Sequence, residues 1–225
     1  MSLISSPKLI IFDCDGVLVD SEPMSIGALK DLFSEHNLEL TYEEVASRFK
    51  GRSLIDTRHS LRTYFNIELR DEAVDRMHQG LLEKFKTDLR QVPGVEEFIS
   101  LLTQPYCVAS SGDPSRIKCA LQSTGLDSYF GNRLFSATQV KLGKPEPDLF
   151  LHAARECSAS PSECLVIEDS PAGVLAAKRA GMMCVGIAAD SFPRTSEDVT
   201  KLSTSGADIV VNSYAALARI IKAVT

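Results

Sequence analysis

Tryptophan is absent from this 225-residue sequence, and long apolar runs, C-x-x-C pairs and runs of basic residues are missing as well. Because no apolar stretch approaches the roughly 20 residues of a membrane-spanning helix, a membrane protein is not expected. The net charge of -6 at pH 7 disfavours a nucleic-acid partner. No signal-peptide pattern opens the chain. These absences predict a cytoplasmic protein with no nucleic-acid or membrane partner.

The composition that is present is that of an ordinary globular protein. Hydrophobic residues make up 44% of the chain and charged residues 24%, and this length can bury one large core or two smaller ones. Most cysteines fall within or beside apolar runs, so we expect small core residues in a reducing compartment rather than a disulfide or zinc framework. The six are Cys14, Cys107, Cys119, Cys157, Cys164 and Cys184.

Near the start of the chain, an apolar run is followed at once by carboxylates. The run of residues 9–12 is typical of a fully buried parallel strand. Asp13 and Asp15 share one face of an extended chain, because alternate side chains point the same way, and Gly16 permits a sharp turn. Two such anions repel each other unless a cation lies between them or one binds a proton. The pattern predicts a functional site, with a surface loop as the alternative.

Residues 24–85 show helical periodicity and no convincing strand. Apolar residues recur at helical spacing, and Thr41 with Glu44 has the form of a capping box that starts a helix. We therefore expect a four-helix-type cap domain at residues 20–92. It would be inserted into a core domain made of residues 1–19 and 93–225.

From Pro93 onward the pattern alternates between strands and helices. Besides the first strand, strands are predicted at residues 106–109, 133–136, 164–167, 183–187 and 208–211. Asp113 with Pro114, and Ser170 with Pro171, are typical of helix starts. Alternating strands and helices form a parallel sheet that is covered on both faces. The predicted fold class is α/β, with a Rossmann-like parallel sheet as the core.

Polar residues follow four of the predicted strands, where ligands of such sheets bind. They are Asp13 and Asp15, Ser110 and Ser111, Lys144, and Glu168 with Asp169. Each has a plainer explanation as a helix cap, a solvated lysine or an acidic pair at a helix start. Their coincidence at the strand ends favours a single site.

Carboxylates with one lysine and a hydroxyl suit a phosphate substrate and a hard cation. Mg²⁺ takes oxygen ligands from one or two carboxylates and the phosphate, and a lysine supplies a point charge. One carboxylate can attack phosphorus, while its neighbour protonates the leaving oxygen and later deprotonates water. The spacing of Asp13 and Asp15 supplies such a pair.

The four motifs, in this order, resemble those of the haloacid dehalogenase superfamily, in the phosphatase-like branch with an inserted helical cap. The resemblance covers essentially the whole chain. It implies that Asp13 is the nucleophile and a metal ligand. It also implies that Asp15 is the general acid/base and lends its backbone carbonyl to the metal. A true dehalogenase is disfavoured because that reaction has no alkoxide for Asp15 to protonate.

The same resemblance assigns roles to the later motifs. Ser110 and the amide of Ser111 would bind phosphate, and Lys144 would neutralise the phosphoryl group and the nucleophile. Asp169 would be the better ligand for Mg²⁺. Glu168 would also belong to the metal site but would lie further from the ion. The preference between Mg²⁺ and Mn²⁺ and the oligomeric state stay open.

The predicted cap carries a loop that resembles a substrate-specificity loop, in which Lys50, Gly51 and Arg52 would bind the substrate. β-Phosphoglucomutases carry an arginine where this chain has Leu54 and a histidine where it has Ser25, which weakens the reading as a sugar phosphomutase. The chain resembles bacterial 6-phosphogluconate phosphatase-like proteins more closely. The expected function is therefore a Mg²⁺-dependent phosphomonoester hydrolase acting on a small anionic sugar phosphate or related metabolite.

Three alternatives remain beside that function. A sugar phosphomutase is not eliminated, because Arg52 could partly replace the missing arginine. A phosphonoacetaldehyde hydrolase would need a Schiff-base lysine from the cap, for which Lys30 and Lys50 are available. A non-catalytic phosphate-binding protein would be expected to lack Asp13 or Lys144, and the chain has both.

Overall fold

The computed structural model describes residues 7–50, 54–189 and 195–222, and the chain divides into two compact units. The first unit is formed by the chain up to Asp20 and from Arg90 onward, and the second by Ser21–Leu89. The helical insertion predicted at residues 20–92 spans the second unit. Its role as a cap over the site stays a prediction.

The first unit is built on one parallel sheet in the order β3-β2-β1-β4-β5-β6. The strands are β1 (Leu9–Phe12), β2 (Tyr106–Ser110), β3 (Leu134–Ser136), β4 (Cys164–Glu168), β5 (Met183–Ile187) and β6 (Ile209–Val211). This confirms all six predicted strands and the α/β fold class. Because β1 lies between β2 and β4, the chain reverses its direction of winding beside β1, where α/β sheets bind ligands.

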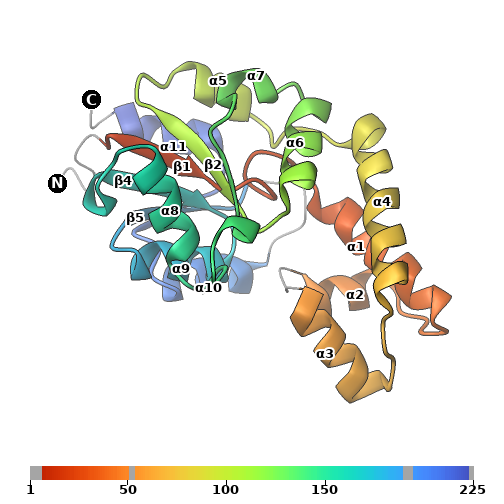
Figure 1. Cartoon of the computed structure of the whole chain (residues 1–225). Coiled ribbons are helices and arrows are strands. Elements are labelled where there is room, and N and C mark those ends of the chain that lie inside the picture. The colour runs from red at the N-terminus through yellow and green to blue at the C-terminus, as the bar shows by residue number, and fades with distance from the viewer. Residues whose placement is uncertain (1–6, 51–53, 190–194, 223–225) are drawn as a thin grey trace. The chain divides into compact units, whose positions relative to one another are not determined.

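Helices cover both faces of this sheet (Figure 1). They are α5 (Val95–Ser100), α6 (Pro114–Ser123), α7 (Asp127–Phe130), α8 (Asp148–Glu156), α9 (Pro171–Arg179), α10 (Ser196–Thr204) and α11 (Tyr214–Lys222), with short 3-10 turns at Ala137–Gln139 and Pro161–Glu163. The helix starts predicted at Asp113 and Ser170 are those of α6 and α9. The sequence patterns did not predict α7 or α10.

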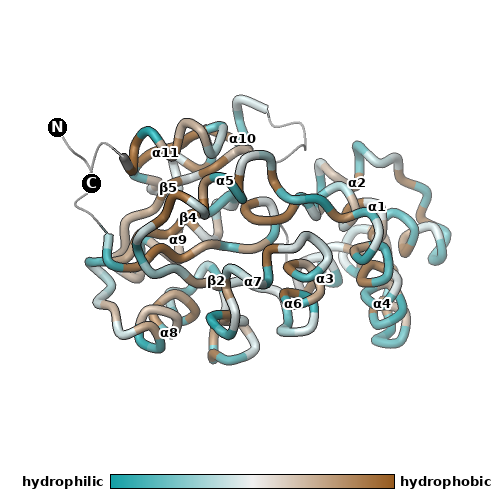
Figure 2. Tube along the Cα trace, turned by 90° about the horizontal axis from the view of Figure 1, so that it is seen from above, coloured by the Kyte–Doolittle hydropathy of each residue, from teal (hydrophilic) through white to brown (hydrophobic). Residues whose placement is uncertain are grey.

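Alternate residues of the strands build two apolar layers. On one face Leu9, Ile11 and Val166 pack with apolar residues of α8 and α9. On the other face the ring of Phe12 makes edge-to-face contacts with Phe98 of α5 and Phe130 of α7, at centroid distances of 6.2 and 5.9 Å. The apolar character of β4 and β5 is visible in Figure 2. The sheet is therefore buried on both sides, and its polar residues gather at the strand ends.

The second unit is helical, as the sequence predicts. It contains α1 (Glu22–Glu35), α2 (Tyr42–Phe49), α3 (Leu54–Phe65) and α4 (Asp71–Asp88). The capping box of Thr41 and Glu44 is present at the start of α2, and the rings of Phe33 and Phe49 pack at 4.9 Å. Among the described residues, no helix is both long and apolar enough to cross a bilayer.

Three local predictions about the sheet unit are confirmed. The side chain of Asp113 accepts hydrogen bonds from the backbone amides of Ser115 and Arg116 at the start of α6. Ser170 caps α9 by accepting from the amide of Gly173 at 3.0 Å. The four cysteines that lie in or beside apolar runs are buried, and all six cysteines of the chain are free thiols.

Candidate active site

The predicted site residues of the sheet unit meet at the carboxyl ends of β1, β2 and β4. Asp13 follows β1 directly, and its amide donates to the carbonyl of Ile167 in β4 at 3.0 Å. Ser110 is the last residue of β2, and Glu168 is the last residue of β4. The parallel register of β1 with both neighbours therefore brings three distant parts of the sequence to one edge.

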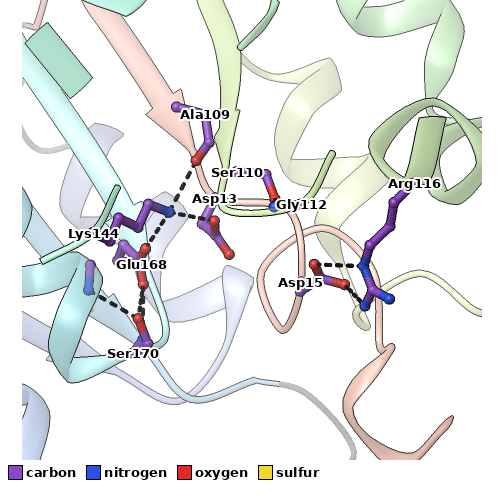
Figure 3. Close-up of polar contacts among 10 residues, drawn as sticks. Asp13, Asp15, Ala109, Ser110, Gly112, Arg116, Lys144, Glu168 and Ser170 are labelled. Atoms are coloured by element: carbon purple, nitrogen blue, oxygen red, sulfur yellow. Dashed lines mark hydrogen bonds and ion pairs between the residues drawn. The ribbon is translucent and has the colours of Figure 1, made fainter. Parts of the chain in front are cut away.

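Lys144 lies at the centre of this group (Figure 3). Its ammonium donates to Asp13 Oδ1 at 2.5 Å, to Glu168 Oε1 at 2.7 Å and to the carbonyl of Ala109 at 3.0 Å. These three bonds use all three donors of the ammonium. Nζ also lies 4.9 Å from the ring centroid of Phe150, within cation–π distance. Only 4% of the lysine side chain is exposed, so its charge is held in a fixed, largely water-free position.

Glu168 is fully buried and fixed from two sides. Its Oε1 accepts from Lys144, and its Oε2 accepts from both the amide and the hydroxyl of Ser170 at 2.9 Å. Gly173 is required beside it, because a Cβ at that position would overlap the Glu168 carboxylate. With both oxygens hydrogen-bonded, Glu168 acts in this arrangement as the anchor of the Lys144 ammonium.

Burial shifts the protonation equilibria of this group. Loss of hydration raises the pKa of Asp13 to about 7, and Glu168 and Asp15 add to the rise, although Lys144 opposes it. Burial alone would lower the pKa of Lys144, but Asp13 and Glu168 raise it above its ordinary value. Lys144 is therefore a permanent cation. Asp13 can exist in either protonation state near neutral pH.

Carboxylate oxygens of Asp13, Glu168 and Asp169 lie within 4.8 Å of one another. Two of these carboxylates share the Lys144 ammonium and Asp169 adds a third, so a cation would balance the remaining negative charge. The donor set consists of oxygens, which fits Mg²⁺. Asp169 packs directly over Gly16, whose φ of +75° and missing Cβ leave room for the carboxylate. Asp13, Glu168 and Asp169 are therefore the residues that could hold the ion, although both Glu168 oxygens also accept hydrogen bonds from Lys144 and Ser170.

The carboxylate of Asp15 is directed to a different partner. Its Oδ1 accepts from Arg116 Nη2 at 2.9 Å, and its Oδ2 lies 3.4 Å from Arg116 Nε (Figure 3). Arg116 comes from the first turn of α6, 101 residues away in sequence, and no motif in the sequence analysis pointed to it. The only sequence signal was its position just after the predicted phosphate-binding serines. Burial acts to lower the pKa of Arg116, but Asp15, together with Cys14 and Asp113, raises it above its ordinary value.

Ser110 is buried, and its hydroxyl accepts from the amide of Gly112 at 3.1 Å. Ser111 is exposed at the same turn. Ser136, at the end of β3, donates to the carbonyl of Gly112 at 2.7 Å and so fixes this turn to the neighbouring strand. The turn leads into α6, whose amino end offers backbone N–H groups of the kind that bind phosphate. The predicted phosphate-binding role of both serines stays a prediction.

Residues 7–181 match the family of haloacid dehalogenase-like hydrolases. The chain belongs to this family. It is 30% identical over 188 residues to the 6-phosphogluconate phosphatase of Escherichia coli K12, covering 83% of this chain and 85% of that protein. It is 32% identical over 196 residues to hexitol phosphatase A of the same organism, covering 84% of this chain and 88% of that protein.

A solved structure agrees with these relatives. A conserved haloacid dehalogenase-like protein from Agrobacterium tumefaciens has 32% sequence identity and a TM-score of 0.85, covering 96% of this chain and 98% of that chain. The family and fold inferred from the four motifs are thus confirmed. Both relatives are named as phosphatases, and this haloacid dehalogenase-like hydrolase is likewise a phosphatase of that family.

The remaining predicted site residues of this hydrolase belong to the helical unit. Lys50 is the C-cap residue that follows α2, while Gly51 and Arg52 lie outside the described residues. Within that unit, a cavity of about 470 Å³ is lined by Ser47, Arg48, Phe49, Ser60, Tyr64 and Phe65. The predicted contact of Lys50, Gly51 and Arg52 with substrate stays a prediction.

Proposed function

We propose that this chain is a Mg²⁺-dependent phosphomonoester hydrolase that transfers the phosphoryl group of a small anionic sugar phosphate to Asp13. One observation carries the proposal. The buried Lys144 ammonium bridges Asp13 and Glu168, and a further carboxylate, Asp169, lies within metal-binding distance of both. A purely structural ion pair would not need a third carboxylate at the same edge of the sheet.

In the first step, Asp13 attacks the phosphorus of the substrate. A bond forms between a carboxylate oxygen and phosphorus as the bond from phosphorus to the leaving oxygen breaks. Asp15, two residues further on, gives its proton to that oxygen, so an alcohol departs. Lys144 stabilises the charge that builds on the phosphoryl oxygens, because it already lies 2.5 Å from Asp13.

In the second step, water hydrolyses the aspartyl phosphate. Asp15, now a carboxylate, removes a proton from the attacking water, and the phosphorus–oxygen bond to Asp13 breaks. Inorganic phosphate leaves, and both aspartates return to their starting protonation states. The same pair of carboxyl groups therefore serves both halves of the reaction.

Asp13 and Asp169, with the backbone carbonyl of Asp15, would hold Mg²⁺. When bound, the ion supplies positive charge that offsets the repulsion between the carboxylates and the phosphate. The burial that raises the pKa of Asp13 acts against its ionised, nucleophilic form, and Lys144 acts in favour of that form.

The substrate class is proposed from two sources. The named relatives include a 6-phosphogluconate phosphatase and a hexitol phosphatase, whose names both describe phosphorylated sugar derivatives. In this chain, Lys50 and Arg52 of the predicted cap loop would attract a second negative charge on the substrate. We therefore expect the substrate to be a small sugar phosphate, and we expect sugar phosphates with a second negative charge to be preferred.

A phosphorus NMR time course with Mg²⁺ tests this proposal, with 6-phosphogluconate and β-glucose 1-phosphate in separate tubes. We expect inorganic phosphate to grow, and to grow faster from 6-phosphogluconate. The Asp13→Asn variant should show no growth. Asp127→Asn removes an exposed carboxylate at the start of α7 and should match the unmodified enzyme.

Two outcomes would contradict the proposal. Glucose 6-phosphate formed from β-glucose 1-phosphate, once a bisphosphate primer is added, would mean a phosphomutase. Appreciable turnover by Asp13→Asn, with the fold intact by circular dichroism, would remove Asp13 as the nucleophile.

A further inference from the structure

We propose that Arg116 is a positioning residue that orients the Asp15 carboxyl group for proton transfer to the leaving oxygen. The inference rests on the proposed function, in which Asp15 is the general acid/base. Arg116 itself touches neither the nucleophile nor the Lys144 ammonium in the contacts described above. It acts on the reaction through Asp15.

The contact between the two side chains is bidentate and partly buried. Two guanidinium nitrogens face the two carboxylate oxygens, at 2.9 Å for Nη2 with Oδ1 and 3.4 Å for Nε with Oδ2. The side chains are 20% and 30% exposed. A fork of two parallel contacts fixes the plane of a carboxylate as well as its position, which a single ammonium cannot do.

The backbone on both sides of this pair is fixed. Arg116 follows the N-cap Asp113, which accepts from the Arg116 amide at 3.0 Å. On the other side, the amide of Gly16 donates to the carbonyl of Val19 at 2.8 Å and closes the turn that carries Asp15. Both side chains therefore extend from hydrogen-bonded backbone of the sheet unit.

Gly112 makes room for the arginine. A Cβ on Gly112 would approach Arg116 Cδ to 3.2 Å and Ser110 Oγ to 3.5 Å. The aliphatic part of Arg116 thus lies against the turn that follows β2. A glycine at this position permits the close approach, and the guanidinium is then directed to Asp15 rather than to solvent.

The position of Arg116 is unfavourable for the helix that carries it. A cation in the first turn of a helix meets the positive end of the helix dipole, where anions are preferred. Helix stability therefore does not account for an arginine here. The Asp15 contact does account for it.

The two contacts differ in length, at 2.9 Å for Oδ1 and 3.4 Å for Oδ2. The shorter bond anchors Oδ1. The longer contact holds Oδ2 less tightly, so the Oδ1 bond sets where the carboxyl group lies. A general acid contributes only while it is held within hydrogen-bonding reach of the leaving oxygen.

The test compares two esters whose leaving groups differ in their need for a proton. 6-Phosphogluconate releases an alkoxide-like oxygen, while p-nitrophenyl phosphate releases a phenolate that leaves without one. We use kcat/KM, because it reports the steps up to loss of the leaving group. For Arg116→Met, kcat/KM should fall by at least about tenfold with 6-phosphogluconate and by less than about threefold with p-nitrophenyl phosphate.

Three further variants sharpen the test. Lys118→Met removes an exposed positive charge from the same helix and should leave both values unchanged. Arg116→Lys keeps the charge but not the fork, and should recover only part of the loss. In an Asp15→Asn background, Arg116→Met should cause no additional loss with 6-phosphogluconate, because residues that act through one another are not additive.

The outcomes separate this inference from the proposed function. Equal losses for both esters would mean that Arg116 binds the phosphoryl group, and unchanged values would mean an ordinary ion pair. Either result overturns the inference and leaves the hydrolase standing. If the unmodified enzyme cleaves neither ester with Mg²⁺, the proposed function fails and this inference fails with it.

Discussion

Removing the Lys144 ammonium should destabilise the sheet unit far more than removing an exposed lysine. The side chain is 4% exposed, and its partners Asp13 and Glu168 are 10% and 1% exposed. In a Lys144→Met variant, both carboxylates lose their cation while they remain buried. Breaking a buried ion pair from one side costs about 3–5 kcal/mol, because an uncompensated charge is left behind.

The penalty should depend on pH, in a direction that follows from Asp13. The pKa of this carboxyl is raised by burial from 3.8 to about 7 in the folded chain. Its protonated form is therefore favoured by folding, and that stabilisation is present at low pH and lost as the pH rises through about 7. Without Lys144, the charged form is less favourable still. The destabilisation by Lys144→Met should be largest at about pH 8 and clearly smaller at about pH 5.5.

Urea denaturation followed by far-ultraviolet circular dichroism measures this effect, with a chelator present to exclude metal. Lys201→Met is the control, because Lys201 forms an exposed pair with Glu197 within one helix, worth at most about 1 kcal/mol. A loss below about 1 kcal/mol for Lys144→Met at about pH 8 would mean that the ammonium does not compensate buried charge. A loss of the same size at both pH values would contradict the pH dependence expected from Asp13.

Three other substitutions and probes test the packing around the site. Gly173→Ala should lower the free energy of unfolding by about 1–3 kcal/mol and reduce turnover, because the added Cβ would displace Glu168. As a control, Gly80→Ala in α4, where the added Cβ meets no other atom, should be neutral or stabilising in the same urea titration. Cys14 should resist alkylation by iodoacetamide in the folded protein, because burial raises the pKa of its thiol, and rapid labelling there would contradict this. Tyr214→Phe removes a buried donor to the loop after β1 and should cost about 1–3 kcal/mol by urea titration; no change would mean that this bond does not stabilise the fold.

Much of the sheet could be predicted because its signals are local. Fully buried strands such as β1 and β4 are continuous apolar runs, and capping residues such as Asp113 and Ser170 mark where the following helices begin. The carboxyl ends of parallel strands lie on one edge of the sheet, so the sequence alone predicts that polar residues at those ends belong to one site. The meeting of Asp13 and Glu168 follows from that rule, whereas Lys144 reaches both from the loop beyond β3.

Other features depend on contacts that no local pattern records. The helix α10 buries only Leu202 among its own residues, so apolar periodicity was too weak to reveal it. Its one usable signal was the capping box formed by Thr195 and Asp198. The pairing of Arg116 with Asp15 joins residues 101 positions apart, and a lone arginine in a helix reads as a surface charge. That Glu168 holds Lys144 with both oxygens occupied was likewise visible only in three dimensions.

Trapping the phosphorylated intermediate would show directly whether Asp13 accepts the phosphoryl group. The Asp15→Asn variant suits the experiment, because p-nitrophenyl phosphate needs no acid for the first step while hydrolysis of the intermediate loses its base. The reaction would be run with Mg²⁺, quenched in acid and examined by peptide mass spectrometry. We expect one added phosphoryl group on Asp13. Release of p-nitrophenol with no phosphoryl group on Asp13, or with one on another residue, would contradict it.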